Sequence, residues 1–317
     1  MARRGKFTRT WLIKPATCLL AVSGGVALSL AVAQGSSTEV GETTANPVVG
    51  VGSPVAPFST VPGSPSYATP SGVLTSWRFH SSGDASAGSV RLKIFRYIGP
   101  GLAFKVLAES SQKTLSPSTS YEFKERIPVS SGDLLGLTAT GDAEVAITVP
   151  GTPQNQLAQF LGGDISVGQT GTATTTFPNL RPSVAATVEP DADHDGYGDE
   201  TQDKCPVDAT TQGFCRIDLG KLKRDKAKGT AILPVTVPGA GTVSLSGKGV
   251  VDQPAANARR AKTATATVKL RVKPAGKAKR KLDRSGKAKV TLVVTYVPAG
   301  GPSVIASKRV KLIKTGT

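Results

Sequence analysis

A run of acidic residues between positions 191 and 203 has the composition and spacing of a calcium-binding loop. Aspartates stand at alternate positions, Asp191, Asp193 and Asp195, and Gly196 follows them. Alternate side chains can point to one centre where the backbone curls, and glycine permits the sharp turn that closes the curl. The carbonyl of Tyr197 and the carboxylate of Asp199 would extend this shell toward the about six to eight oxygen ligands that Ca²⁺ takes. Mg²⁺ fits less well, because it requires a smaller octahedral shell and keeps its waters.

With the Cys205-Pro206 pair that ends it, this run resembles a thrombospondin type 3 repeat over 191–206. The resemblance implies calcium ligation by the same residues and adds Asp203 as the closing ligand. Asp203 stands one position later than the closing aspartate usual in that family, and Gln202 occupies the twelfth position, where an EF-hand places a bidentate glutamate. We therefore expect weak affinity, about 10⁻⁴ to 10⁻³ M. The alternative is a solvated acidic linker that holds no ion.

The N-terminal residues 1–33 have the pattern of a secretory signal peptide. Five basic side chains precede an uncharged run rich in Ala, Leu and Val, which ends in Ala31-Val32-Ala33. A basic start, an apolar middle and an Ala-x-Ala end are the marks of a cleaved signal. A transmembrane anchor is the alternative, but Gly24 and Gly25 interrupt the run and no basic stop-transfer segment follows. We expect a secreted or extracellular protein, associated with the cell surface or free, with no membrane span after cleavage; the export route, Sec or Tat, is left open.

Two cysteines, Cys205 and Cys215, remain once the signal is removed. Outside the cell disulfides persist, so these two can close a short loop worth roughly 2–3 kcal/mol against the unfolded chain. Two free thiols are the alternative.

Strand patterns dominate the remaining sequence, which predicts an all-β chain. Residues 34–61 are Ser, Thr, Pro, Gly and Val with few charges, and we expect a flexible leader there. Short alternating apolar and polar runs separated by Gly and Ser clusters then predict a jelly-roll-like β-sandwich over 62–189. The calcium loop with its cysteine pair spans 190–215.

Residues 216–317 predict a second, immunoglobulin-like β-sandwich. This stretch resembles the Ig-like C-terminal domains of bacterial secreted proteins in its turn and strand patterns at 228–231, 237–247, 282–286 and 296–301, which carry no chemistry. The expected strands cover 230–237, 242–246, 263–272, 288–296 and 303–313.

Charge divides the chain after the cysteine pair. Residues 34–215 hold 10 basic and 18 acidic side chains, whereas 216–317 hold 24 and 4. Ten of these cations lie from Lys269 to Lys289. Their density predicts a positive face that attracts an anionic cell-envelope polymer or polysaccharide. A merely solvated, aggregation-resistant surface is the alternative. Sequence-specific nucleic-acid binding is not expected, because Tyr296 is the only aromatic residue there.

We expect no enzymatic activity. The two histidines, His80 and His194, stand in no triad or metal motif, and the chain has no nucleophile elbow, HExxH or phosphate loop. The sequence favours an adhesion or scaffold protein in which Ca²⁺ rigidifies the connector. The alternative is a carbohydrate-binding module, in which Phe95 and Tyr97 of the first sandwich would face outward and stack on sugar rings.

Overall fold

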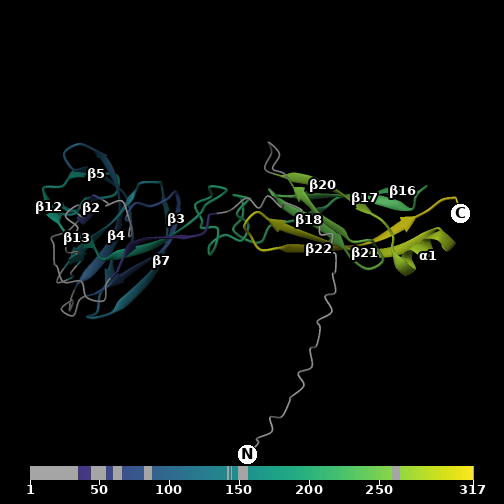
Figure 1. Cartoon of the computed structure of the whole chain (residues 1–317), viewed down its shortest axis with the longest axis horizontal. Helices are drawn as coiled ribbons and strands as arrows, with labels where there is room; N and C mark the ends of the chain where they lie inside the picture. The colour runs from purple at the N-terminus through teal and green to yellow at the C-terminus, as the bar shows by residue number, and fades with distance from the viewer. Residues whose placement is uncertain are drawn as a thin grey trace, which may run out of the picture. The chain divides into compact units, whose positions relative to one another are not determined.

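The structure is a computed structural model that describes residues 35–43, 55–59, 66–81, 88–140, 143, 145–148, 156–258 and 265–316. The predicted signal peptide lies outside the described residues. Strands and a single short helix make up the regular structure of the described part, which confirms the all-β sandwich prediction (Figure 1). Within the same residues no helix is both long and apolar enough to cross a membrane.

Two antiparallel sheets build the first sandwich. The smaller has the order β1-β14-β3-β7, and the larger has the order β11-β5-β4-β8-β2-β10-β12, with β6 beside β4. The strands of the smaller sheet are β1 (Thr38–Glu42), β3 (Gly72–His80), β7 (Ser120–Val129) and β14 (Val184–Glu189). Those of the larger are β2 (Val55–Ser59), β4 (Ser89–Gly99), β5 (Ala103–Glu109), β6 (Lys113–Thr114), β8 (Leu134–Thr140), β10 (Gln156–Gln159), β11 (Thr170–Thr172) and β12 (Thr175–Pro178). The short strands β9 (Ala146–Thr148) and β13 (Leu180–Pro182) pair with each other.

Alternation along these strands places apolar side chains between the sheets. Trp77 of β3, Leu92 of β4, Leu135 of β8 and Val184 of β14 are fully buried in one core cluster. Burying side chains of this size stabilises the fold by roughly 1.5–3 kcal/mol each. A smaller cluster forms around stacked aromatic rings of the larger sheet and its neighbouring loop.

The expectation of a flexible leader over 34–61 is wrong where the structure describes it. Strand β1 pairs with β14 from Thr38 to Glu42, and β2 pairs with both β8 and β10. Val40 is buried in the core. Composition did not indicate these strands, because the neighbouring strands of the sheets, rather than the segment's own apolar residues, supply most of the surface against which they pack.

The second sandwich also consists of two antiparallel sheets. One has the order β15-β17-β16 with β20 also beside β17, and the other has the order β19-β18-β21-β22. The strands are β15 (Asp218–Leu219), β16 (Lys223–Asp225), β17 (Thr230–Val237), β18 (Gly241–Ser246), β19 (Gln253–Ala258), β20 (Ala266–Val272), β21 (Lys287–Pro298) and β22 (Val304–Ile313). The predicted strand over 230–237 coincides with β17, and the other four predicted strands lie on β18, β20, β21 and β22.

Tyr296 occupies the core of the second sandwich. Its ring is fully buried, and its hydroxyl donates to the carbonyl of Ala240 (3.0 Å), with the carbonyl of Gly239 a second acceptor at 3.2 Å. A Cβ at Gly241 would lie 2.7 Å from this ring, so only glycine allows the strand to approach so closely. Burial raises the pKa of Tyr296 to about 12. A buried Tyr296 offers no platform on which a nucleic-acid base could stack.

One helix interrupts the strands of the second sandwich. Helix α1 (Gly276–Ser285) ends at Gly286, which takes a left-handed conformation with φ of 64°. Leu282 is its one buried residue and packs into the second core. The sequence predicts that the cations of this stretch lie beside strands, whereas five of them lie on α1: Lys277, Lys279, Arg280, Lys281 and Arg284. Strand alternation therefore does not decide where their side chains point.

Candidate metal centre

The acidic run begins where β14 ends, and the buried carboxylate of Glu189 fixes its start. Glu189 is 2% exposed. Its oxygens accept hydrogen bonds from the hydroxyls of Thr75 (2.9 Å) and Thr201 (2.6 Å), and from the N–H groups of Glu200 (3.0 Å) and Thr201 (2.9 Å). A Cβ at Gly198 would lie 2.4 Å from Glu189 Oε2, so the loop closes tightly over this carboxylate. The first sandwich thus holds the loop through charge-assisted hydrogen bonds.

Gln202 stands at the position where an EF-hand has its bidentate glutamate, and here its side chain makes hydrogen bonds to the protein. Its side-chain amide donates to the carbonyl of Glu125 in β7 (2.8 Å) and accepts from the N–H of Gly198 (3.2 Å). Beside it, the guanidinium of Arg126 lies 4.2 Å from the centre of the Tyr197 ring. Gln202 therefore ties the loop to the sheet rather than facing an ion.

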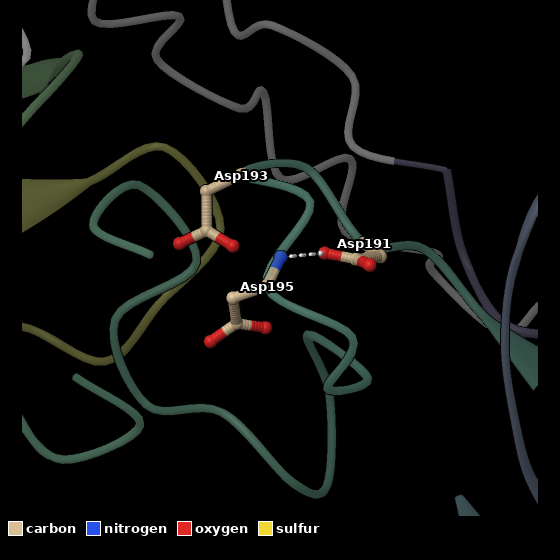
Figure 2. Close-up of side chains that lie close together, drawn as sticks. All are labelled: Asp191, Asp193 and Asp195. Carbon is tan, nitrogen blue, oxygen red and sulfur yellow. Dashed lines mark hydrogen bonds between the residues drawn. The ribbon is translucent and has the colours of Figure 1, made fainter. Parts of the chain in front are cut away.

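Three aspartates converge on one centre. Each of Asp191, Asp193 and Asp195 offers a carboxylate oxygen, and these oxygens lie within 4.8 Å of one another (Figure 2). The curl is closed by the N–H groups of Asp195 and Gly196, which donate to the two oxygens of Asp191 (3.1 and 3.0 Å). Gly196 has φ of 82°, where glycine is favoured. The predicted convergence of alternate aspartates is therefore present.

Asp193 is distinct within this cluster because its carboxylate has no well-formed hydrogen bond, and the N–H of Asp195 has only a small effect on its pKa. Both of its carboxylate oxygens are buried and unpartnered, as is Oδ2 of Asp203. Burial is the largest cause that raises the pKa of Asp193 to about 6. Repulsion from the carboxylates of Asp195, Asp203 and Asp191 adds to this rise. A buried carboxylate without a donor is unfavourable unless a cation compensates it.

Asp199 and Asp203 complete the acidic group, and both are almost fully buried, at 5% and 3% exposed. Burial raises the pKa of Asp199 to about 7, although the N–H of Ala192 donates to both of its oxygens (3.2 Å each) and opposes the shift. Burial also raises the pKa of Asp203, whose Oδ1 accepts from the N–H of Cys205 (2.7 Å). Repulsion from neighbouring carboxylates adds to the effect of burial on the pKa values of Asp193, Asp199 and Asp203.

The predicted residues thus lie in one loop, and ligation of an ion by any of them stays a prediction. Tyr197 is half-buried, and its N–H donates to Oδ1 of Asp195 (2.8 Å); ligation through its carbonyl stays a prediction. Sequence reasoning missed Gln212, whose amide donates to Oδ2 of Asp195 (2.8 Å), and Glu189. No local spacing could reveal Gln212, because it lies 17 residues beyond Asp195.

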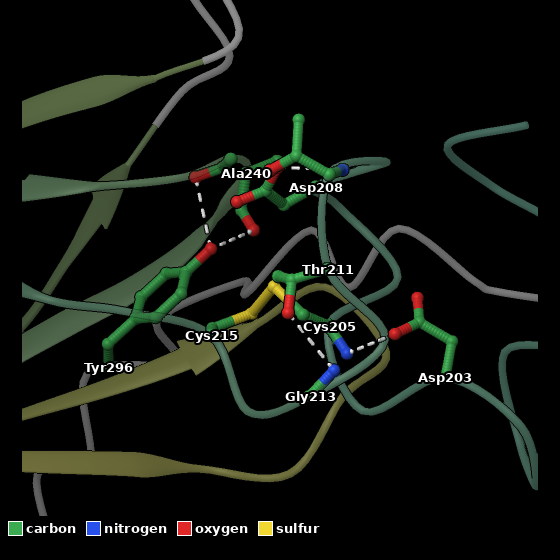
Figure 3. Close-up of a disulfide and its surroundings, with 10 residues drawn as sticks. Asp203, Cys205, Asp208, Thr211, Gly213, Cys215, Ala240 and Tyr296 are labelled. Atoms are coloured by element: carbon green, nitrogen blue, oxygen red, sulfur yellow. Dashed lines mark hydrogen bonds between the residues drawn. A yellow bond between two sulfur atoms is a disulfide. The ribbon is translucent and has the colours of Figure 1, made fainter. Parts of the chain in front are cut away.

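The predicted disulfide is confirmed. Cys205 and Cys215 are bonded, with their Cα atoms 4.9 Å apart, and both are buried in the core cluster of the second sandwich (Figure 3). Pro206 and Val207 follow the bridge, and a Cβ at Gly239 would lie 2.6 Å from Cβ of Val207. Figure 3 shows Asp203 immediately before the bridge, bonded to the N–H of Cys205. The end of the acidic loop is therefore fixed to the second sandwich.

Outside this loop, the residues considered for other chemistry are not assembled into a site. Phe95 is fully buried and stacks on Phe160 at a centroid distance of 5.6 Å, whereas Tyr97 is 46% exposed. The pair of outward rings that sugar stacking requires is therefore not formed. His80 lies 2.7 Å from the hydroxyl of Ser120, and His194 is exposed with φ of 62°.

Comparison with known proteins yields no family. No family model matches the chain, and no curated protein matches it. Among solved structures, Bifidobacterium dentium β-glucuronidase complexed with coumarin-3-O-glucuronide is 14% identical, with a TM-score of 0.19, and the match covers 82% of this chain but 39% of that one. Bacteroides uniformis β-glucuronidase 2, covalently bound to cyclophellitol-6-carboxylate aziridine, is 11% identical with a TM-score of 0.17, over 81% of this chain and 26% of that one. These TM-scores are far below those of proteins that share a fold, so no property is transferred from either enzyme.

Proposed function

We propose that the chain is a secreted, non-enzymatic scaffold or adhesion protein in which Ca²⁺ bound by the 191–203 loop rigidifies the connector between two β-sandwiches. The observation that carries this proposal is the buried, unpartnered carboxylate of Asp193, next to the unpartnered Oδ2 of Asp203. Carboxylate oxygens are hard ligands of the kind that Ca²⁺ takes, and the group contains no nitrogen or sulfur donor that would favour zinc. Ca²⁺ would compensate the burial of these carboxylates and neutralise the repulsion between them, which together raise their pKa values.

The attachments of the loop support a structural role for the ion. Glu189 and Gln202 bind the loop to the first sandwich, and the disulfide and Val207 bind its end to the second. An ion held by residues spaced between these attachments would restrain the backbone that connects them. The residues that would hold it are Asp191, Asp193, Asp195, Asp199, Asp203 and the carbonyl of Tyr197.

The charge contrast supports the adhesive part of the proposal. The second sandwich carries most of the excess positive charge, and a basic surface attracts anionic polymers of a cell envelope in a salt-sensitive manner. In this arrangement the basic sandwich docks and the first sandwich is presented.

Limited proteolysis of the protein lacking residues 1–33 tests the rigid connector. Lys204 is exposed and lies in the connector, so a lysine-specific protease can cut after it. We expect Ca²⁺ at a few millimolar to slow this cut at least tenfold relative to excess chelator, with no such protection in the variant carrying Asp193→Ala and Asp195→Ala. Equal protection of the variant, or an unchanged rate in the unaltered protein, contradicts the proposal.

A further inference from the structure

A basic groove lies beside α1 in the second sandwich. It is a cavity of about 950 Å³ whose walls are α1, the strands β21 and β22, and the turn after β18. Six cations line it and no carboxylate does: Lys248, Lys277, Lys281, Lys289, Arg309 and Lys311. All six are exposed, and none of them has an ion pair among the described residues. Asp283, the one acidic residue on α1, pairs with Lys279 and Lys314 instead.

The walls of the groove are held in place by backbone contacts. The N–H of Ala275 donates to the carbonyl of Gly249 (2.9 Å), and the N–H of Thr291 donates to that of Lys248 (3.1 Å). Gly249 has φ of 83°, and a Cβ there would lie 2.8 Å from Cβ of Ala278. The start of α1 can therefore approach the turn closely, and the cations are carried on a fixed frame.

Like charges stand next to each other within each wall of the groove, at a cost to stability. Lys289 of β21 stands directly opposite Lys311 of β22. Like charges in this position are destabilising, because directly opposite Cβ atoms in an antiparallel pair are only about 4.5–5.5 Å apart. On the other wall, Lys277 and Lys281 are four residues apart on α1, which is also an unfavourable spacing for like charges. An anion between the walls would relieve both repulsions.

The start of α1 adds a further preference for an anion. Its cap residue, Ala275, makes no side-chain capping bond, and the first turn contains no acidic residue. The positive end of the helix dipole therefore faces the groove without the usual complement, and Lys277 adds to its charge. Helix N-termini with nearby lysines are suited to phosphate.

We propose that this groove binds a linear chain of linked phosphate groups. Five of its six cations are lysines, which bind phosphate as point charges, and the uncapped start of α1 adds the preference for phosphate. Because the six cations are spread over both walls and the turn, a chain of linked phosphates can contact more of them than one phosphate can. This assignment rests on the proposed adhesive function and names the polymer class that the basic sandwich takes.

The experiment is a titration of inorganic polyphosphate into the protein lacking residues 1–33, in chelator so that calcium plays no part. The groove variant carries Lys289→Gln and Lys311→Gln. The matched control carries Lys223→Gln and Lys269→Gln, which remove the same charge from exposed positions on β16 and β20 of the other sheet. A polyuronate with the same number of charges is the second ligand.

We expect the groove variant to lose at least tenfold in affinity and the control less than threefold. The slope of log affinity against log salt should fall by roughly one to two in the groove variant, because two phosphate contacts are lost. The polyuronate should bind the unaltered protein at least tenfold more weakly than polyphosphate. Thermal unfolding of the groove variant should be no lower than that of the unaltered protein, since an opposed pair of like charges is removed.

Three results would overturn the assignment. Equal losses in the groove variant and the control would mean that attraction is spread over the whole basic surface. Equal affinity for the polyuronate would show that the groove does not prefer phosphate. The absence of polyphosphate binding would show that the groove is not a phosphate-binding site. The calcium part of the proposed function is measured separately by proteolysis, so the groove and the calcium connector can fail independently.

Discussion

Replacing Asp193 by asparagine should stabilise the protein when calcium is absent. When calcium is present, the variant should be less stable than the unaltered protein. Both carboxylate oxygens of Asp193 are buried without a well-formed hydrogen bond, so Asp193→Asn removes a charge and at most a weak contact with the N–H of Asp195. The pKa of Asp193 is raised from 3.8 to about 6, and each pKa unit corresponds to about 1.4 kcal/mol. That sets an upper limit of about 3 kcal/mol, which partial exposure to solvent reduces to about 1–2 kcal/mol. The calcium-free variant should be more stable by this amount at pH 7.5.

The sign depends on pH in a defined way. Because the folded-state pKa of Asp193 is raised, the penalty is absent below the usual pKa of aspartate, grows from about pH 4 to about pH 6, and is complete above that. The stabilisation by Asp193→Asn should therefore disappear near pH 4. Calcium acts in the opposite direction: with a dissociation constant of about 10⁻⁴ M, 10 mM Ca²⁺ stabilises the unaltered protein by about 2.7 kcal/mol. The variant loses this gain, so in calcium the unaltered protein becomes the more stable by about 1 kcal/mol.

Urea unfolding at pH 7.5 and pH 4, in chelator and in 10 mM Ca²⁺, measures this crossover. Asp218→Asn is the matched control, because Asp218 is an exposed acid outside the loop and should shift the midpoint little in any condition. The reasoning is refuted if Asp193→Asn destabilises the calcium-free protein at pH 7.5, since its carboxylate would then make a favourable contact without an ion.

The remaining predictions concern pH, the loop anchor and the disulfide. Calcium affinity should fall as the pH drops through 7 toward 6, because Asp199 and Asp193 have pKa values raised to about 7 and about 6 and must lose their protons to bind. Calorimetry in buffers of different ionisation heat should register this proton release. A calcium affinity that does not change between pH 7 and pH 6 would contradict the prediction. Gln202→Ala should cost about 1–2 kcal/mol by leaving the carbonyl of Glu125 without its partner, and hydrogen exchange should quicken in the loop rather than in the second core. Replacing Cys205 and Cys215 by serine should destabilise the second sandwich by roughly 2–3 kcal/mol, read as a lower unfolding midpoint, and an unchanged midpoint would count against a structural bridge.

The strands of the second sandwich were the most predictable part of the fold. Their alternation is regular and their ends carry Gly or Pro, so β17 begins and ends where the pattern places it. Helix α1 was not predicted, because its sequence is mostly basic and only Leu282, which is buried, and Ala278, which is partly buried, pack against the core. Two apolar residues four positions apart are too short a periodicity to indicate a helix.

The candidate site was predictable to the extent that it is local. The spacing of Asp191, Asp193 and Asp195 brings their carboxylates together through one turn, and the sequence alone indicates that turn. The bonds that fix the loop are not local, since Glu189 binds Thr75 across 114 residues and Gln202 binds Glu125 across 77. Composition likewise could not show that 38–42 and 55–59 join sheets whose other strands lie far along the chain.

Calorimetric titration of Ca²⁺ into the protein lacking residues 1–33 tests the central claim most directly, beside a variant carrying Asp193→Ala and Asp195→Ala. The account predicts saturable binding with a dissociation constant of about 10⁻⁴ to 10⁻³ M, abolished in the variant. Binding that survives in the variant, or no heat up to millimolar calcium in the unaltered protein, would contradict a calcium site at this loop.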